Sequence, residues 1–342
     1  MSRFTESLRA WFLLFRPWSY TATLIPFLLA AGFVFGHDLA TGCVISVRWG
    51  YWGLGLVAGL FFQATVNLLN TWGDERSGVD DVHNAIRTTP QVHDGLVSLN
   101  AVLIVGLCCA AIASLIGVGL CFYPWKGAWC FNKALLIAGF VGFLGSLNYS
   151  TGVKFKYRGL GVPFVSFLMG PLEVFAALAL LMPRDAPDVI LTPPLLIVFL
   201  LVTLPNAVLV GVIMHGNDMR DIPSDREAGI VTLASWLGPR RALSYYRLCH
   251  VLPYCVCLLL LAVAEWIGYS ISDRLTSIPL VFLLPFLCLP LTIKTLRTAN
   301  AVYRSSPDNP PWRRLERGSG GILFAFGILY SLAFALRCLP IG

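Results

Sequence analysis

The sequence predicts an all-α polytopic membrane protein with nine transmembrane helices. Of its 342 residues, 57% are hydrophobic and only 13% are charged. Apolar runs of about 18 or more residues recur along the chain, and a run of that length spans a bilayer as a helix. They must be helical because backbone polar groups in lipid need internal partners. The predicted spans are 19–36, 51–70, 98–121, 132–150, 163–182, 193–214, 248–267, 275–293 and 321–340. We treat residues 1–342 as a single integral-membrane domain.

The ends of these spans predict the orientation of the chain. The opening stretch MSRFTESLRAWFLLFRPWSY lacks a small-residue cleavage site, so we expect residues 1–18 to form an interfacial segment. If the N-terminus is cytoplasmic, most of the 25 Lys and Arg residues lie in cytoplasmic segments of a cell or inner membrane. We assign the run Arg313, Arg314 and Arg317 to this bias of basic residues toward the cytoplasmic side, and not to a substrate site. The same bias explains the net charge of +7 without a nucleic-acid partner.

Half of the acidic residues fall in two loops. The loop over 71–97 carries five acids and the loop over 215–243 carries four, out of 18 in the chain. Both loops are cytoplasmic in the predicted topology, and they follow the second and the sixth span. This spacing suggests two similar four-helix halves plus a ninth helix. We therefore expect the two loops to face each other and to form one active site.

The first acidic segment begins at the end of a span. Asn70 and Asp74 are four residues apart and therefore share a helix face. Asp80 comes six residues later, and Gly78 can turn the chain so that Asp80 returns to the same side. These three side chains are candidates for one polar site.

The second acidic segment has a similar spacing. Asn217, Asp221 and Asp225 recur every four residues and form one stripe on a helix. Pro223 lacks a backbone N–H and disfavours helix at the residue before it. The sequence therefore predicts a helix break near residues 221–223, with the carboxylates at a helix end.

Clustered carboxylate and amide oxygens suit a hard cation such as Mg²⁺, which shares its coordination shell with water and substrate phosphates. Basic side chains near both segments can pair with the remaining phosphate oxygens. Two other interpretations stay open: ordinary solvated loops with helix-capping Asp residues, or a secondary transporter with ion sites at membrane depth.

Four stretches together resemble the UbiA superfamily of intramembrane prenyltransferases. NLLNTWGDERSGVD (67–80) and NDMRDIPSDREAGIVTLA (217–234) resemble its two Asp-rich motifs. FRPWSYTATLIP (15–26) and YSTGVKFKYRGLG (149–161) resemble segments of the 1,4-dihydroxy-2-naphthoate polyprenyltransferases, the MenA type, and of their vertebrate relatives that make menaquinone. The resemblance implies a nine-helix fold. It also implies Mg²⁺-dependent transfer of a polyprenyl group from polyprenyl diphosphate to 1,4-dihydroxy-2-naphthoate, with decarboxylation.

The resemblance also implies roles for individual residues. The metal–diphosphate site is expected to contain Asn70, Asp74, Asp80, Asn217, Asp221 and Asp225. Further diphosphate contacts are expected from Asn67, Arg76, Arg87, Lys156, Tyr157, Arg158 and Arg220. Either Tyr149 or Tyr157 is expected to stabilise the allylic cation through its ring face.

The sequence departs from the family pattern in two places. Val162 follows Gly-Leu-Gly where the naphthoate branch usually has an acid, and the nearest acid downstream is Glu173. In the second motif, Asn217-Asp218 stands where Asn-Asn is common, and Pro223 lies within the Asp spacing. The first departure leaves other acceptors open: another quinone precursor, a tetrapyrrole, or a sugar or lipid phosphate.

Overall fold

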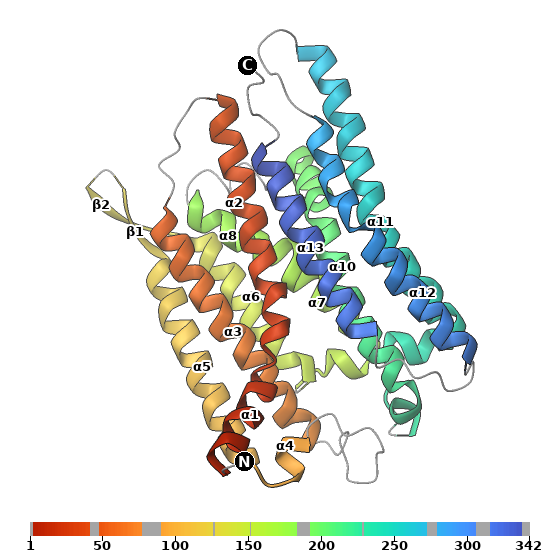
Figure 1. Ribbon diagram of the computed structural model, residues 1–342. Coiled ribbons are helices and arrows are strands. Elements are labelled where there is room, and N and C mark those ends of the chain that lie inside the picture. The colour runs from red at the N-terminus through yellow and green to blue at the C-terminus, as the bar shows by residue number, and fades with distance from the viewer. Residues whose placement is uncertain are drawn as a thin grey trace.

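A computed structural model of the protein describes residues 3–41, 48–76, 90–125, 127–150, 152–182, 192–227, 229–271, 279–305 and 315–336. The described chain is a bundle of long helices (Figure 1). The first part comprises α1 (Arg3–Phe15), η1 (Pro17–Tyr20), α2 (Thr21–Thr41), α3 (Trp49–Arg76), α4 (Pro90–His93), α5 (Leu99–Leu120), β1 (Phe122–Trp125), β2 (Ala128–Phe131), α6 (Lys133–Ser150) and η2 (Phe155–Tyr157). The second part comprises α7 (Gly161–Phe167), η3 (Leu168–Leu172), α8 (Glu173–Leu181), α10 (Pro193–Glu227), α11 (Leu233–Ile271), η4 (Pro279–Cys288), α12 (Leu289–Ser305) and α13 (Leu315–Leu336).

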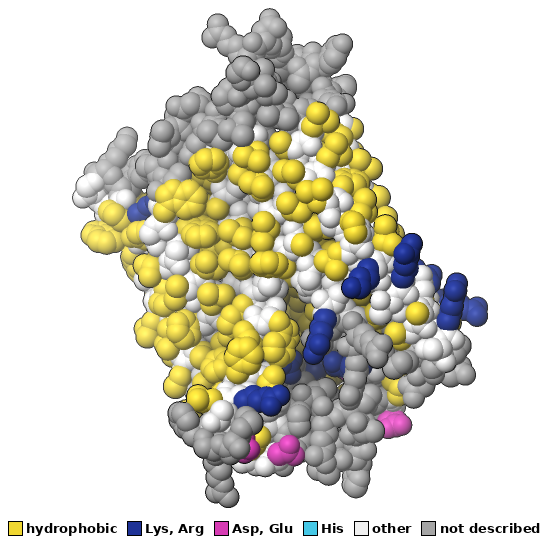
Figure 2. All heavy atoms as spheres, in the orientation of Figure 1, with side chains coloured by type: hydrophobic (Ala, Val, Ile, Leu, Met, Phe, Trp, Pro, Cys, Tyr) yellow, Lys and Arg dark blue, Asp and Glu magenta, His cyan; other side chains and the backbone are white. Residues whose placement is uncertain are grey.

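The helices cover the predicted apolar runs, but several extend beyond them. Helix α10 continues to Glu227 and α11 begins at Leu233, so most of the predicted loop over 215–243 is helical. Eight helical segments in the described part of the chain are long and apolar enough to cross a membrane, and Lys133–Tyr149 of α6 is a shorter apolar helix. The count of nine spans therefore stays a prediction. Hydrophobic side chains cover the middle of the visible face, whereas the visible acids and most of the visible bases lie toward its lower part (Figure 2). These features describe an integral, multi-pass membrane protein.

Close helix contacts hold the bundle together where small residues meet. A Cβ atom on Gly32 or Gly36 of α2 would overlap the carbonyl oxygens of Ser331 and Phe334 on α13. Small residues allow helix backbones to approach in this way, and such contacts replace the hydrophobic driving force that lipid does not supply. These contacts bring the first and last membrane helices side by side.

The all-α prediction missed a short β-hairpin between α5 and α6. Its strands β1 and β2 are antiparallel, and Phe122 pairs with Phe131. Gly127 lies in the tight connection at φ 82°, a backbone region that glycine enters at low cost. The hairpin lies in the short connection between the predicted spans 98–121 and 132–150, which the search for long apolar runs left without an assigned structure.

The predicted helix break at residues 221–223 is wrong. Helix α10 runs without interruption from Pro193 to Glu227 and includes Pro223. Pro223 removes the hydrogen bond to the carbonyl four residues earlier, but it lies near the end of the helix, where later residues can still close their own turns. The helix ends at Glu227, and Gly229 adopts φ 66°. Asp221 and Asp225 therefore lie one turn apart on a regular helix.

The ends of α3, α6 and α10 lie at the same end of the bundle as the N-terminus, as does the start of α13 (Figure 1). Both acidic loops therefore begin at one end of the molecule, as the sequence predicts. Which side of a membrane this end faces stays a prediction.

Candidate active site

A cavity of about 1050 Å³ opens among the helices. Along α3 its lining extends from Gly55 to Asn70, which is about 22 Å at a rise of 1.5 Å per residue. Most of the lining is apolar. Polar side chains gather where the acidic loops begin, namely Arg16, Asn67, Asn70, Tyr149, Asn217 and Arg317. The cavity therefore has a polar end and a long apolar body, as an amphiphilic ligand requires.

Helix α3 supplies one wall of the polar end. Asn67 is buried, and its Nδ2 donates to the Phe15 carbonyl at 2.8 Å and to Ser19 Oγ at 2.9 Å. Asn67 therefore ties the connection between α1 and α2 to α3, in addition to lining the cavity. Asp74 follows one turn after Asn70 in the same helix. Asp80 and Arg87 lie outside the described residues.

Helix α10 supplies the opposite wall. Arg220 holds Asp221 through two hydrogen bonds of 2.6 Å, from Nε to Oδ1 and from Nη2 to Oδ2. Its Nη1 is 3.5 Å from Asn217 Oδ1. Arg220 thus orients two of the predicted metal ligands, because a guanidinium can bond both carboxylate oxygens at once.

Asp225 is fixed by the start of the next helix. Its Oδ2 accepts a hydrogen bond from Thr232 Oγ1 at 3.0 Å, and its backbone carbonyl accepts one from Ile230 N at 2.7 Å. Thr232 also caps α11, because its Oγ1 accepts from Ser235 N at 3.2 Å while Ser235 Oγ accepts from Thr232 N at 2.8 Å. We call this arrangement the Thr232 latch. It places the Asp225 carboxylate at a defined position on the last turn of α10.

The loop between α6 and α7 joins the same end of the molecule. A parallel β-bridge connects Arg158 to Val231, so this loop touches the segment that follows α10. Lys156 lies within electrostatic range of Asp218, together with Asp225, Asp221 and Arg220. The predicted diphosphate-binding lysine therefore stands beside the second acidic segment, although about 60 residues separate them in sequence.

The two candidate tyrosines differ in their surroundings. Tyr149 is buried at the end of α6 and lines the cavity. Tyr157 does not line it, and its ring lies 5.4 Å from Lys156 Nζ and 6.0 Å from Lys154 Nζ. The geometry therefore favours Tyr149 for a contact with a cation inside the cavity.

Five of the described phosphate-contact candidates lie outside the cavity lining: Arg76, Lys156, Tyr157, Arg158 and Arg220. Arg76 is exposed, with its guanidinium carbon 5.2 Å from the centre of the Trp72 ring. Arg158 is also exposed, and its described role is the backbone bridge to Val231. Neither side chain is among the residues that line the cavity.

Three charged residues of the site escaped sequence reasoning. Arg317 lines the cavity, although we assigned it from the sequence only to the excess of cytoplasmic basic residues. Arg16 also lines it, from a left-handed backbone at φ 50° that a side chain rarely adopts and that often marks functional sites. Asp218 is only 8% exposed and lies near the acids of α10. Its spacing of three residues from Asp221 and seven from Asp225 was the available signal.

The oxygen donors of this end suit a hard divalent cation. Among the described residues, no three acidic, His or Cys side chains converge on one point. Mg²⁺ does not require such a cage, because it commonly takes one or two carboxylates and completes its shell with water and substrate phosphates. Asp221, Asp225, Asn70 and Asn217 provide the right chemistry, while Arg16, Arg317 and Lys156 supply positive charge for an anionic head group.

Comparisons with known proteins agree with this geometry. The sequence profile of the UbiA prenyltransferase family matches residues 23–304. The chain is 30% identical over 332 residues to UbiA prenyltransferase domain-containing protein 1 of Ailuropoda melanoleuca, covering 94% of this chain and 84% of the relative. It is 30% identical over 329 residues to the Homo sapiens protein of that name, covering 94% and 83%. The Drosophila melanogaster homolog is 27% identical over 330 residues, covering 95% and 79%.

Solved structures share the fold at low sequence identity. A UbiA homolog from Archaeoglobus fulgidus bound to DMAPP and Mg²⁺ superposes with a TM-score of 0.59 and 17% identity, covering 95% of this chain and 98% of that one. The same homolog bound to GPP and Mg²⁺ has a TM-score of 0.58 and covers 95% and 99%. A UbiA homolog from Aeropyrum pernix K1 has a TM-score of 0.53 and 14% identity, covering 92% and 96%.

Proposed function

We propose a specific reaction for this chain, which belongs to the UbiA prenyltransferase family and is a prenyltransferase of that family. It transfers a polyprenyl group from polyprenyl diphosphate to 1,4-dihydroxy-2-naphthoate, which loses its carboxylate, in menaquinone biosynthesis. One observation carries the proposal: a single cavity joins a charged, oxygen-rich end to an apolar body long enough for a prenyl chain. The diphosphate of the donor occupies the polar end, and its tail lies among the apolar side chains.

The polar end activates the donor. Breaking the allylic C–O bond leaves the electron pair and negative charge on diphosphate, so groups that stabilise this charge accelerate the step. Asp221 and Asp225, with Asn70, Asn217, Asp74 and Asp80, would hold Mg²⁺. When bound there, the metal would supply Lewis-acid stabilisation of the phosphate oxygens. Lys156, Arg16 and Arg317 pair with the oxygens that remain.

The apolar surroundings protect the allylic cation until the acceptor reacts. Tyr149 lines the cavity near its polar end and presents its ring to the cation. An electron-rich ring carbon of the acceptor then forms the new C–C bond, and loss of carbon dioxide restores the aromatic ring. Similarity to UbiA prenyltransferase domain-containing protein 1 supports the family assignment, while the MenA-type acceptor rests on the motifs quoted above.

The proposal is tested with purified protein in nanodiscs. The protein is incubated with geranylgeranyl diphosphate, Mg²⁺ and 1,4-dihydroxy-2-naphthoate, and the products are identified by mass spectrometry. We expect a prenylated, decarboxylated naphthoquinol that is absent with EDTA and in Asp74→Ala and Asp221→Ala. If the protein releases diphosphate only with another acceptor from a panel of quinone precursors, that compound would replace the naphthoate as the proposed acceptor. If the folded protein neither binds nor turns over the donor, yet moves ions across vesicle membranes, the protein would be a transporter and not a prenyltransferase.

A further inference from the structure

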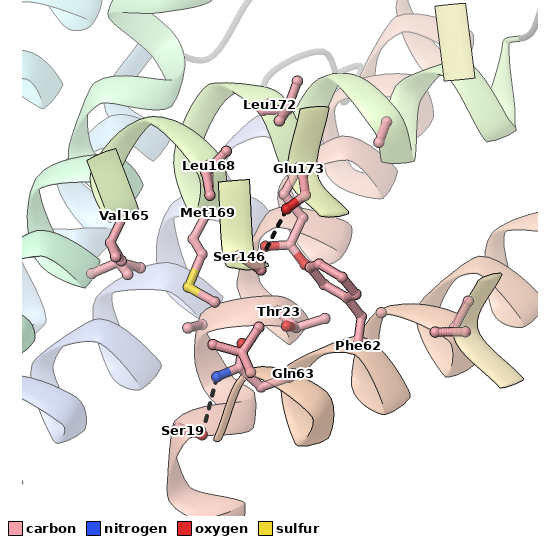
Figure 3. Close-up of a pocket in the computed structure, with 18 of the residues that line it drawn as sticks. Ser19, Thr23, Phe62, Gln63, Ser146, Val165, Leu168, Met169, Leu172 and Glu173 are labelled. Carbon is pink, nitrogen blue, oxygen red and sulfur yellow. Dashed lines mark hydrogen bonds between the residues drawn. The ribbon is translucent and has the colours of Figure 1, made fainter. Parts of the chain in front are cut away.

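Deep in the cavity, away from the polar end, lies the carboxyl group of Glu173 (Figure 3). Its neighbour on α3 is Gly59, because a Cβ there would lie 3.8 Å from Glu173 Oε1. Gly59 precedes Asn70 by eleven residues, or about 16 Å along the helix. Glu173 therefore does not belong to the metal–diphosphate site. An ionisable side chain at membrane depth is costly and is usually kept for a function.

A distortion of the helix backbone places Glu173. The Glu173 N–H reaches back to the Leu168 carbonyl, the pattern of the π-helix η3. The Met169 carbonyl accepts a hydrogen bond from Asn206 Nδ2 at 2.8 Å instead. Single π-turns of this kind are frequent at functional sites. Asn206 on α10 thus supports the turn from which the Glu173 side chain enters the cavity.

The part of the cavity around Glu173 contains one buried hydrogen-bond acceptor without a partner. The Thr23 hydroxyl donates to the carboxylate. Gln63 is only 4% exposed, and its Oε1 has no partner although its Nε2 donates to Ser19 Oγ at 3.3 Å. Phe62 and Met169 supply apolar walls that face the same space (Figure 3). A buried oxygen without a partner is costly, and a ligand hydroxyl would satisfy it.

The charge around Glu173 excludes an anionic group from direct contact with its carboxyl group. Among the described residues, the basic side chains that line the cavity are Arg16 and Arg317, and both belong to the polar end. Near Glu173 the pocket instead offers a carboxylate and an amide oxygen, which accept hydrogen bonds. It therefore selects a neutral group that carries O–H donors, set against aromatic and thioether surfaces.

We propose that Glu173 and Gln63 form the subsite that binds the hydroxyl groups of the aromatic acceptor. This inference rests on the proposed prenyl transfer and adds the residues that recognise the acceptor. The ring lies between Phe62 and Met169, with its hydroxyl end toward Glu173 and its reacting carbon toward Asn70. One hydroxyl group donates to Glu173 and the other to Gln63 Oε1, which otherwise has no partner.

Glu173 also takes part in the chemistry. As the ring carbon bonds to the allylic carbon, the C–O bond to diphosphate breaks and its electron pair leaves with diphosphate. The hydroxyl proton passes to Glu173, and the ring oxygen becomes a ketone. Loss of the acceptor carboxylate as carbon dioxide returns an electron pair to the ring, and the oxygen recovers its proton from Glu173. Atoms and charge balance without a further reactant.

Steady-state kinetics in nanodiscs test this inference, with 1,4-dihydroxy-2-naphthoate and geranylgeranyl diphosphate varied separately. We expect Glu173→Ala to raise the acceptor KM by about tenfold or more, the effect of losing a hydrogen bond to a charged group. The donor KM should stay within about twofold, because Glu173 lies far from the diphosphate. Glu173→Gln keeps a hydrogen-bonding group but cannot take a proton, so its kcat should fall by about a hundredfold. Glu6→Gln on α1, outside the cavity lining, is the matched control.

A methylated probe separates recognition from a general structural effect. 1,4-Dimethoxy-2-naphthoate lacks the hydroxyl donors, so its inhibition constant should be the same for wild type and Glu173→Ala. Equal weakening of diol and dimethyl ether, or an unchanged acceptor KM, would overturn the assignment of Glu173. Wild-type protein that transfers no prenyl group to any aromatic acceptor would overturn the proposed function itself, whatever the variants do.

Discussion

The Thr232 latch allows a sharp test of how the second acidic segment is positioned. Thr232→Val replaces the hydroxyl with a methyl group of similar size at a site that is only 2% exposed. The variant loses the 3.0 Å hydrogen bond to Asp225 and the 3.2 Å cap on Ser235 N. It leaves both carboxylate oxygens of Asp225 and the fold of α10 otherwise intact.

The expected size of the effect follows from these two bonds. A hydrogen bond to a charged group contributes about 1.5–3 kcal/mol. Loss of a Thr cap costs about 1 kcal/mol. Together they predict that the closed arrangement of residues 229–235 loses about 2.5–4 kcal/mol, or two to three orders of magnitude in its equilibrium population. Because Asp225 is then poorly oriented, we expect the Mg²⁺ concentration for half-maximal activity to rise by about tenfold or more.

Two measurements check this prediction. Hydrogen exchange of residues 229–235 in nanodiscs reports the opening of the latch, and Mg²⁺ titration of prenyl transfer reports its effect on the metal site. Thr232→Ser keeps the hydroxyl and serves as the control, with near-normal Mg²⁺ dependence. If Thr232→Val shows unchanged exchange and unchanged Mg²⁺ dependence, Asp225 is positioned by something other than Thr232.

Three further predictions concern packing, charge and the metal. Gly170→Ala should lower the thermal midpoint in detergent by an amount equivalent to about 1–3 kcal/mol, because the new Cβ would lie 2.8 Å from the Cα of Ala207. Gly117→Ala on α5 is the control and should not lower the midpoint, because a Cβ there would have nothing within 4 Å. Lys156→Met should raise the donor KM about 10- to 100-fold, because it removes a charged contact with the phosphate, while Lys154→Met should change the donor KM little. Equal effects of the two variants would show that Lys156 does not contact the diphosphate. EDTA should abolish turnover, and added Mg²⁺ should restore it; activity that survives complete chelation would contradict a metal-held diphosphate.

Local patterns in the sequence predicted much of the fold. Long uncharged runs predict helices because lipid offers no partner for an unbonded peptide group. In the described part of the chain, most of these runs form helices long and apolar enough to span a membrane. The four-residue spacing of Asn217, Asp221 and Asp225 predicted their common helix face. The prediction about Pro223 failed because a proline near a helix end removes one bond without preventing the remaining turns.

Acidic residues beside two spans also indicated where the site begins, but not which distant groups complete it. Arg16 and Arg317 lie 301 residues apart in the chain and line the same cavity. The bridge between Arg158 and Val231 likewise joins two loops from different parts of the sequence. Such pairs depend on which helices are neighbours in the bundle. The hydrophobic periodicity of a single helix does not predict which helices those are.

The sequence by itself determined the class of protein, the apolar helices and the two clusters of oxygen donors, because length, hydrophobicity and four-residue spacing act within one helix. Only the tertiary structure decided that Glu173, Gln63 and Arg317 line one cavity. These placements follow from close backbone contacts, such as Gly170 against Ala207, whose partners lie on separate helices. Lipid supplies no hydrophobic force to choose among helix neighbours, so the shape of these contacts makes the choice.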